Sequence, residues 1–446
     1  MLTISKSIGP SLLLLAAYLG SSSAFSSIQV FFNHRESSQY VEPYRQLLRS
    51  GDNLEGEIIR AIQSAKTSVE VAVQELSLPD IAKALGDAVR RGVRVRLILE
   101  NQYSRPMSDL SEAEILKLDP YMKGKYEEFV KLVDVNQDGS LSEEETRERD
   151  ALKIIRGAGV QWIDDTADGS MGSGLMHHKF VIIDGMRVII TSANFSHSDI
   201  HGDFSSLKTT GNANSLLTLL SSDLAVVFLE EFEILWSKKF GLKKRYRPSK
   251  SLSLNGIKIK VQFSPVSKTK GWEASVNGLI ERELLAARQS ADLALFVFSE
   301  QRLVNALRNT TNVRALIEPG FAYRYYSELL DMLGLKMRDT KCRYEAANNP
   351  WLVPISAVGI PLLEGGDKFH HKFAVLDENR VIVGSHNWSN AANHTNDETL
   401  IVIESSFVVK EYFEEFNRAY RRSIIGVPAW LTQKIQKIDE QCLFIQ

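Results

Sequence analysis

Cysteine is scarce in this chain of 446 residues, which contains only Cys342 and Cys442. Two cysteines cannot build the dense disulfide framework that stabilises small secreted domains. An exported chain could still join these two to each other, and the sequence leaves that pairing open. Neither cysteine lies near the motifs described below, so we place both outside the functional site.

A strong net charge is also absent. The chain has 53 lysines and arginines against 55 aspartates and glutamates, a formal net charge of −2. It therefore lacks the overall basic field that attracts nucleic acids. The one strongly basic stretch, residues 237–251, is typical of a solvated surface segment and less often contacts a polyanion or an anionic membrane. The length and the hydrophobic fraction of 44% indicate an ordinary globular protein of two or three domains.

Long apolar runs are lacking after the N-terminus. There, Lys6 precedes an apolar run at 12–19 and small residues at 21–24, which predicts a secretory signal peptide over residues 1–24. The run is too short to span a bilayer comfortably, since spanning takes about 20 residues. We therefore expect a secreted or periplasmic protein whose signal peptide is cleaved, with an uncleaved membrane anchor as the alternative.

What the chain does contain is one short pattern in two copies. HHKFVIID at 177–184 and HHKFAVLD at 370–377 both fit His-x-Lys-x-x-x-x-Asp. Each copy is followed by a second predicted strand that ends in a Ser-x-Asn turn, at 191–196 and at 384–389. Four of the nine histidines lie in these two copies. Such repetition indicates two related halves that bring two His/Lys pairs to one site.

The residue types in this pattern suit covalent phosphoryl transfer. An imidazole titrates near neutrality, so one histidine can attack while the other carries a proton. A lysine two residues along a strand points to the same face as its histidine. The lysines, with the amides of Asn194 and Asn387, would hold phosphate oxygens as charge builds in the transition state. His178 and His371 point to the opposite strand face, which predicts a structural role.

Two other interpretations of the pattern remain. A single His-x-Lys copy is more often a strand end with a satisfied histidine than a catalytic group. A zinc site is opposed by the adjacent ammonium group, and no cysteine or cluster of carboxylates completes a ligand set. Two full copies with matching turns favour catalysis.

These motifs resemble the signature of the phospholipase D superfamily, which carries two HKD motifs per active site. The resemblance implies an α/β fold of two homologous halves, each a mixed β-sheet flanked by helices, that meet at a pseudo-twofold axis. It also implies a phosphohistidine intermediate on His177, with His370 as acid and base, and a monomer, because one chain holds both halves. Carried over residue by residue, it gives these candidate catalytic residues: His177, Lys179, Asp184, Asn194, His370, Lys372, Asp377, Asn387 and Glu398.

The first half departs from that family pattern at two places. Thr191 stands where the second half has Gly384, and Asn214 stands where a glutamate is expected. In the second half, Glu398 fits the carboxylate that orients a histidine in the family. A missing carboxylate removes one support for imidazolium charge, so we expect lower activity or less symmetric roles for the two histidines.

The periodicity of the apolar residues, together with the proline and glycine residues that end helices and strands, predicts the same order of elements in both halves. We expect a first half over 25–236, a basic linker over 237–256 and a second half over 257–446. The first half has predicted strands at 28–32, 68–76 and 93–100 and helices at 54–65 and 79–91. The second has predicted strands at 257–263, 291–298 and 313–318 and helices at 274–289 and 300–308.

The first half also carries an insertion at about 120–150. Its segment DVNQDGSLSEEE at 134–145 fits the calcium-loop pattern D-x-[DN]-x-[DN]-G-x5-E at every position. With helical periodicity on both sides, it resembles an EF-hand; an acidic loop that fits by chance is the alternative. A single loop favours a structural or gating Ca²⁺ site near the active cleft. The predicted ligands are Asp134, Asn136, Asp138, Ser140, Ser142 and Glu145, with Gly139 at the sharp turn.

Together these features predict a secreted, calcium-binding phosphodiesterase of phospholipase D type that hydrolyses phospholipids. An endonuclease acting on DNA or RNA with the same HKD site is the alternative, and the chemistry is identical in both. An apolar rim on the cleft would favour a lipid, and a basic track would favour a nucleic acid. A catalytically inactive calcium-dependent binding module and phosphatidyl transfer between alcohols are the other possibilities.

Overall fold

The computed structural model describes residues 27–172 and 174–443 of the chain. The predicted signal peptide at 1–24 lies outside the described residues. Within the described ranges, no helix has both the length and the apolar character needed to cross a membrane.

The first half is built on one mixed sheet of seven strands. β7 lies at its centre, antiparallel to β8 and β4, and the pairs β4–β5 and β5–β6 are parallel. Strands β7 and β4 are buried on both faces because helices cover both sides of the sheet. In spatial order the strands are β1 (Ile28–Phe32), β9 (Ser215–Leu220), β8 (Arg187–Thr191), β7 (Lys179–Ile183), β4 (Ser68–Val73), β5 (Arg94–Leu99) and β6 (Gln161–Asp164).

The second half repeats this sheet strand for strand and adds one strand at each edge, which gives nine. The central antiparallel and outer parallel pairings are the same as in the first half. The prediction of two related α/β halves with mixed sheets is therefore confirmed. In spatial order the strands are β10 (Lys250–Leu254), β11 (Ile257–Ser264), β19 (Glu398–Glu404), β17 (Arg380–Gly384), β16 (Lys372–Leu376), β12 (Ser290–Leu295), β14 (Asn312–Ile317), β15 (Val358–Pro361) and β20 (Ser423–Ile425).

The helices that flank the two sheets begin where the sequence places caps. Asn53 accepts the amide hydrogen of Gly56, and Pro79 occupies the first turn of its helix. The predicted helix at 274–289 ends earlier, at Ala286, because the next amides bind Asp377 instead. The main flanking helices are α1 (Leu54–Ser64), α2 (Pro79–Arg90), α8 (Ser222–Trp236), α9 (Val276–Ala286), α10 (Gln301–Ala306) and α14 (Ser406–Arg421).

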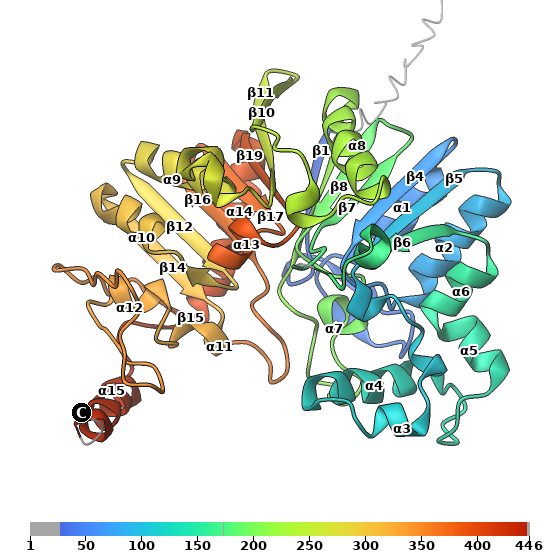
Figure 1. Ribbon diagram of the computed structural model, residues 1–446, viewed down its shortest axis with the longest axis horizontal. Coiled ribbons are helices and arrows are strands. Elements are labelled where there is room, and N and C mark those ends of the chain that lie inside the picture. Colours follow the sequence, from blue (N-terminus) through green and yellow to red (C-terminus); the bar gives the residue numbers. More distant parts are fainter. Residues whose placement is uncertain (1–26, 173, 444–446) are drawn as a thin grey trace, which may run out of the picture.

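One apolar cluster runs through both halves and holds them together. Across the junction, the rings of Phe228 and Phe263 lie 5.2 Å apart and those of Phe32 and Tyr412 lie 5.0 Å apart. The Tyr412 hydroxyl also donates to Ser215 Oγ at 3.2 Å. Because this packing is continuous, the two sheets lie side by side as one body (Figure 1).

Residues 237–256 do not form the free basic linker that the sequence predicts. Part of the segment is β10, which pairs with β11 along the edge of the second sheet. Lys244 is buried in ion pairs with Glu231 and Asp397, and Arg247 pairs with Glu230. Three of the seven cations of this stretch, Lys243, Lys244 and Arg247, are therefore paired with carboxylates of the protein itself.

The insertion of the first half forms a helical layer below its sheet in Figure 1. It comprises α3 (Glu112–Ile115), α4 (Pro120–Val133), α5 (Glu143–Arg149) and α6 (Ala151–Gly157). In the second half, α15 (Ala429–Cys442) is tied to the preceding chain by a disulfide between Cys342 and Cys442. The remaining short elements are β2 (Gln39–Val41), β3 (Leu48–Ser50), α7 (His197–Ile200), β13 (Phe298–Ser299), α11 (Pro319–Ala322), α12 (Glu328–Met332), β18 (Trp388–Ser389) and α13 (Asn390–His394).

Candidate active site

Each motif histidine precedes a central strand and is bonded to the opposite half. The amide hydrogen of His177, just before β7, donates to the carbonyl of Asp397 at 2.9 Å. Beside His370, just before β16, the Lys368 carbonyl accepts from the amide of Ala213 at 2.8 Å. Both rings are almost buried, with 7% and 8% of the residue exposed. The site therefore lies at the junction, and each half completes the other.

The ring partners of the two histidines also come from the opposite half. His177 Nδ1 donates to Glu398 Oε2 at 2.7 Å, and His370 Nδ1 lies 3.0 Å from Asn214 Oδ1. Carboxylate and amide oxygens only accept, so both contacts place the proton on Nδ1 and leave Nε2 free to attack or to receive a proton. Glu398, the predicted orienting carboxylate, thus contacts the histidine of the other half.

The serine of each turn supports these partners. Ser385 Oγ donates to Glu398 Oε2 at 2.7 Å, and Ser192 Oγ donates to Asn214 Oδ1 at 2.7 Å. Thr191, the departure from the family turn, donates its hydroxyl to the carbonyl of Ser215 at 2.7 Å. Replacement of the turn glycine by threonine therefore leaves the arrangement of the turn intact.

Two buried lysines bring positive charge to the same place. Lys179 Nζ donates to the His177 carbonyl at 3.0 Å, and Lys372 Nζ donates to the His370 carbonyl at 2.8 Å. Burial lowers the pKa of Lys179 to about 8. Burial and the neighbouring ammonium group of Lys179 hold the pKa of Lys372 well below its ordinary value. A buried ammonium group that disfavours the charge of its neighbour gains stability when the site binds an anion.

The same environment disfavours the protonated form of both imidazoles. Burial, followed by the positive charge of the lysines, holds the pKa of His177 and of His370 well below the ordinary value. A bound phosphodiester anion would offset the lysine charges and allow one imidazole to carry a proton. Substrate binding therefore sets up the pair of one neutral and one protonated histidine that the chemistry requires.

Asn194 and Asn387 lie at the turns that follow β8 and β17, as predicted. Their side-chain Oδ1 atoms are buried and have no hydrogen-bond partner within the described residues. A buried amide oxygen without a partner costs about 1–3 kcal/mol. Asn194 also lines the cleft described below, together with His370. An amide oxygen only accepts, so each Oδ1 needs a donor such as a ligand hydroxyl or a water, and Nδ2 is the atom that can donate to a phosphate oxygen.

Asp184 and Asp377 lie outside the site, which corrects their prediction as catalytic residues. Each follows the far end of its strand, with a positive φ of 53° and 48°. The Asp184 carboxylate accepts from the amides of residues 66–68, and that of Asp377 accepts from the amides of residues 288–290. These bonds lower the pKa of both carboxyl groups against the effect of burial. Their role is to anchor the start of the neighbouring strand.

His178 and His371 have the structural role that their position predicts. His178 donates to or accepts from Thr399 Oγ1 at 2.8 Å, and His371 Nε2 lies 2.9 Å from Glu415. His178 also groups with Glu231 and Asp397 closely enough for a shared cation. The ammonium group of Lys244 pairs with both carboxylates, so a cation of the protein already fills that role.

A cleft of about 840 Å³ leads to His370 and Asn194. The first half supplies most of its wall, chiefly from residues 101–152, including six apolar side chains of the segment from Met107 to Leu132. Sequence analysis missed three further polar or aromatic residues here: Lys125 Nζ binds Glu75 at 2.6 Å, the Phe296 ring lies 4.7 Å from that of His370, and Asp199 faces His370. The apolar residues are Met107, Leu110, Leu118, Met122, Phe129 and Leu132.

The predicted calcium loop lies between α4 and α5, with its oxygen atoms turned toward its own backbone. Asp134 accepts from the amides of Asp138 and Gly139, and Gly139 has the φ of +82° that a sharp turn requires. Glu145 accepts from the amide of Val135 and forms a capping box with Ser142. The loop thus gathers hard oxygen donors of the kind that Ca²⁺ binds, and these residues fit the ion chemically.

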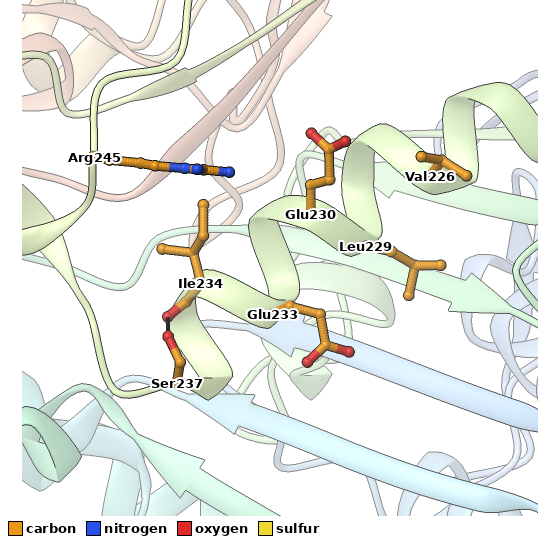
Figure 2. Close-up of a pocket in the computed structure, with 7 residues that line it drawn as sticks. All are labelled: Val226, Leu229, Glu230, Glu233, Ile234, Ser237 and Arg245. Atoms are coloured by element: carbon orange, nitrogen blue, oxygen red, sulfur yellow. Dashed lines mark hydrogen bonds between the residues drawn. The ribbon is translucent and has the colours of Figure 1, made fainter.

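A second hollow, of about 420 Å³, lies on the outer face of α8 and has no link to this chemistry (Figure 2). Its two carboxylates are already paired, Glu233 with Arg96 at 2.6 Å and Glu230 with Arg247 at 2.9 Å. Ser237 donates to the Ile234 carbonyl. Because both carboxylates and the serine hydroxyl are already bonded, we assign this hollow no role.

Comparison with known proteins identifies the family. Residues 58–236 and 280–420 match the family described as "Cardiolipin synthase, PLD-like domain". The chain belongs to this PLD-like family. Both HKD motifs lie within the matched residues, one in each matched range.

Among curated relatives, the chain is similar to the "Mitochondrial cardiolipin hydrolase" of Mus musculus, with 32% identity over 33% of this chain and 59% of that protein. The Homo sapiens protein of the same name is also 32% identical, over 34% of this chain and 52% of that protein. The chain thus spans little more than half the length of these relatives. A solved phosphatidylserine synthase from Haemophilus influenzae Rd KW20 covers 88% of this chain and 92% of its own, with a TM-score of 0.51 and 12% identity. That likeness shows the two-half fold.

Proposed function

We propose that this protein is a phospholipase D-type hydrolase that cleaves the phosphodiester bond of phospholipids. The apolar wall of the cleft carries the proposal. Six apolar side chains line the same cleft as His370, one of the two motif histidines, and as Asn194. Such a wall suits acyl chains, because burying apolar surface contributes about 25 cal/mol per Å². The names of the curated relatives support a lipid substrate.

The charges of the cleft oppose a nucleic acid. Its cations are Arg105, Lys125 and Lys368, and the first two are paired with Glu114 and Glu75. Carboxylates outnumber them, and include Glu75, Glu127, Glu128, Asp150, Asp199 and Asp203. A strand of DNA or RNA needs a basic track along its phosphates. A neutral or apolar molecule with a single phosphodiester group fits this lining better.

The proposed reaction proceeds in two balanced steps. His177 Nε2 attacks phosphorus, the bond from phosphorus to the head-group oxygen breaks, and His370 gives its proton to that oxygen. Water then attacks the phosphohistidine, His370 takes a proton from it, and the bond from nitrogen to phosphorus breaks to release phosphatidate. Lys179, Lys372 and the two asparagines would hold the phosphate oxygens throughout. Glu398 keeps the attacking ring in one tautomer because it accepts the Nδ1 proton.

The substrate proposal is tested by assaying the purified protein on three substrates side by side, with His370→Ala as the inactive control. The substrates are vesicles of phosphatidylcholine, vesicles of cardiolipin, and single-stranded DNA, each with and without Ca²⁺. We expect hydrolysis of at least one lipid and little cleavage of DNA. Robust cleavage of DNA with no release of lipid head group would favour the nuclease alternative. A radiolabelled lipid quenched in acid should leave its label on His177.

We also propose that residues 134–145 bind one Ca²⁺ in a structural or gating role. The ligands would be side-chain oxygens of Asp134, Asn136 and Asp138, the Ser140 carbonyl, a water held by Ser142, and both oxygens of Glu145. Bound there, the ion would supply charge neutralisation between α4 and α5. Support comes from the position of the loop directly after α4, whose Met122 and Phe129 line the cleft. Stabilising α4 would stabilise the wall.

We further propose that the protein is exported and works as a monomer. The disulfide between Cys342 and Cys442 is the kind of bond that persists in oxidising compartments. Both halves of one chain complete a single site, which supports activity without a second copy. N-terminal sequencing of the mature protein should find a start near residue 25. A mature protein that still begins at residue 1 and stays with membranes would support the anchor alternative instead.

A further inference from the structure

The two histidines are held by different groups, and the difference extends beyond Asn214. In the second half, Glu398 gives His177 a full carboxylate at hydrogen-bond distance. In the first half, the equivalent Asn214 gives His370 a neutral amide. A carboxylate stands close behind that amide: Asp199 Oδ1 lies 3.5 Å from His370 Nδ1. Although Asn214 replaces the expected glutamate with a neutral amide, His370 still lies close to a carboxylate, that of Asp199.

Asp199 occupies a position where the other half has no polar group. It follows His177 by 22 residues, and Ala392 follows His370 by the same interval. Both residues are third in a short helix with a serine cap, α7 after Ser196 and α13 after Ser389. The first half thus has Asp and Asn where the second half has Ala and Glu. One carboxylate is present in each half, at different points of the same framework.

A network of amides holds the Asp199 carboxylate in place. Asn212 Nδ2 donates to Oδ1 at 2.8 Å, and Asn214 Nδ2 lies 3.4 Å from the same oxygen. Oδ2 accepts from the amide of Asn194 at 3.1 Å and from Ser196 Oγ at 3.2 Å. The side chain is buried, with only 4% of the residue exposed. These bonds fix the carboxylate between the amide partner of His370 and the turn that carries Asn194.

We propose that Asp199 is a positioning residue for His370 and replaces the glutamate that the first half lacks. It acts through its own charge beside the imidazole, and its backbone carbonyl, which accepts from Asn214 Nδ2 at 2.9 Å, helps to orient the Asn214 amide. The inference rests on the proposed hydrolase function and deepens it, because it assigns the anion that lets His370 serve as proton donor and acceptor. The amide fixes the direction of the ring, and the carboxylate supports its protonated form.

The charges around His370 agree with this role. Burial would raise the pKa of Asp199, yet the charges of His370 and of nearby lysines, with the Asn212 hydrogen bond, lower it to about 2. Asp199 is thus an anion at any working pH. Lys372, Lys179 and His177 also face His370 and lower its pKa, whereas Asp199 raises it. Removing the carboxylate should therefore make protonated His370 harder to form.

The decisive experiment exchanges the carboxylate between the two positions. Four proteins are compared with the natural chain: Asp199→Asn, Asp199→Ala, the double variant Asp199→Ala with Asn214→Glu, and Asp223→Asn. The last removes an exposed carboxylate of α8 and is the matched control. Rates are measured on phospholipid vesicles and on bis(p-nitrophenyl) phosphate, a small diester that requires no lipid recognition. Thermal melting shows whether each variant is folded.

We expect Asp199→Asn and Asp199→Ala to lower kcat by about 10- to 100-fold with little change in KM, the scale of a weakened general acid. The basic limb of the kcat profile should move to lower pH. The double variant reproduces the Ala and Glu of the second half and should recover most of the lost rate. Asp223→Asn should match the natural chain.

Three results would overturn the inference: full activity of Asp199→Asn, an unshifted pH profile, or a folded double variant that recovers nothing. If Asp199→Ala fails to fold, Asp199→Asn decides the question, since it keeps the shape and removes the charge. A natural chain that cleaves neither lipid nor the small diester would contradict the proposed hydrolase function itself. In that case, titration of His370 by NMR in the natural chain and in Asp199→Asn still tests the inference, and an equal pKa in the two proteins would refute it.

Discussion

The connection after β5 in the first half and the connection after β14 in the second occupy equivalent places, yet they are built differently. The first, residues 100–160, carries α3 to α6 and the proposed calcium loop. The second, residues 318–357, carries α11 and α12 and the cysteine that is bridged to α15. Among the described residues, only the first connection lines the catalytic cleft.

This difference separates chemistry from substrate choice. The strands that place the two histidines are the same in both halves, because each ring must meet a partner from the other half. The connections face no such requirement and have diverged. We infer that the reaction is served by both halves almost equally, whereas recognition of the substrate belongs mainly to the first.

The largest expected effect tests the inference that both halves contribute equally to the reaction. His177→Ala and His370→Ala should each lower kcat by about a thousandfold or more, because nucleophile and acid act as one unit. Both variants should melt near the temperature of the natural chain. Steady-state rates on vesicles check this. Near-normal turnover in either folded variant would show that the two halves do not share one site.

A smaller effect should separate the two connections. Met122→Asp places a charge in the apolar wall and should lower kcat/KM on phospholipid vesicles by about tenfold, roughly the loss of one buried apolar side chain. Its rate on a small soluble diester should stay near normal. Leu352→Asp is the matched control, since Leu352 is exposed in the second connection. Equal losses in both variants would place lipid recognition outside the first connection.

Ca²⁺ bound to the first connection should change the stability of the folded protein more than the rate of the reaction. At a hundredfold excess over Kd, Ca²⁺ binding should stabilise the fold by about 2.7 kcal/mol. Glu145→Ala should abolish this gain, and the neighbouring Glu144→Ala should keep it. Titration calorimetry measures Ca²⁺ binding by each variant, and thermal melting with and without chelator measures the gain in stability. We expect chelator to leave residual activity, because the two lysines already supply the positive charge at the site. Absence of binding in calorimetry would refute the proposed loop.

The smallest effect concerns Asp184 and Asp377. Each of them anchors the start of the neighbouring strand in its own half. Each replacement by Asn should destabilise the fold by about 1–3 kcal/mol at pH 7, through weaker bonds to backbone amides. Their pKa values are lowered on folding, so this contribution is complete above the ordinary carboxyl pKa and is lost as pH falls below it. Denaturant unfolding at pH 7 and pH 3 should show the difference shrink in acid, equally for both variants.

The sequence was sufficient to predict the repeated strands, both His/Lys pairs and the two asparagines. Strand period and scarce residues are local signals, and they placed β4, β7, β12 and β16 correctly. Which half orients which histidine could not be predicted, because Glu398 lies 221 residues from His177 and no local pattern reports that contact. Asp199 could have been found by aligning the two halves, since its counterpart is Ala392.

Two errors have clear physical reasons. Asp184 and Asp377 belong to the motif, and membership of a motif does not distinguish a residue that reacts from one that anchors a strand. Residues 237–256 looked like a linker because they are basic, but Lys244 and Arg247 meet buried carboxylates of α8 and of the second half. Charge along a sequence does not show which charges will meet.

The exchange of partners between the halves also sets the time at which the protein becomes active. The ribosome makes His177 long before it makes Glu398, and His370 and Lys372 follow in the same late stretch. Until that stretch has emerged and docked, the first imidazole has neither its orienting carboxylate nor its proton donor.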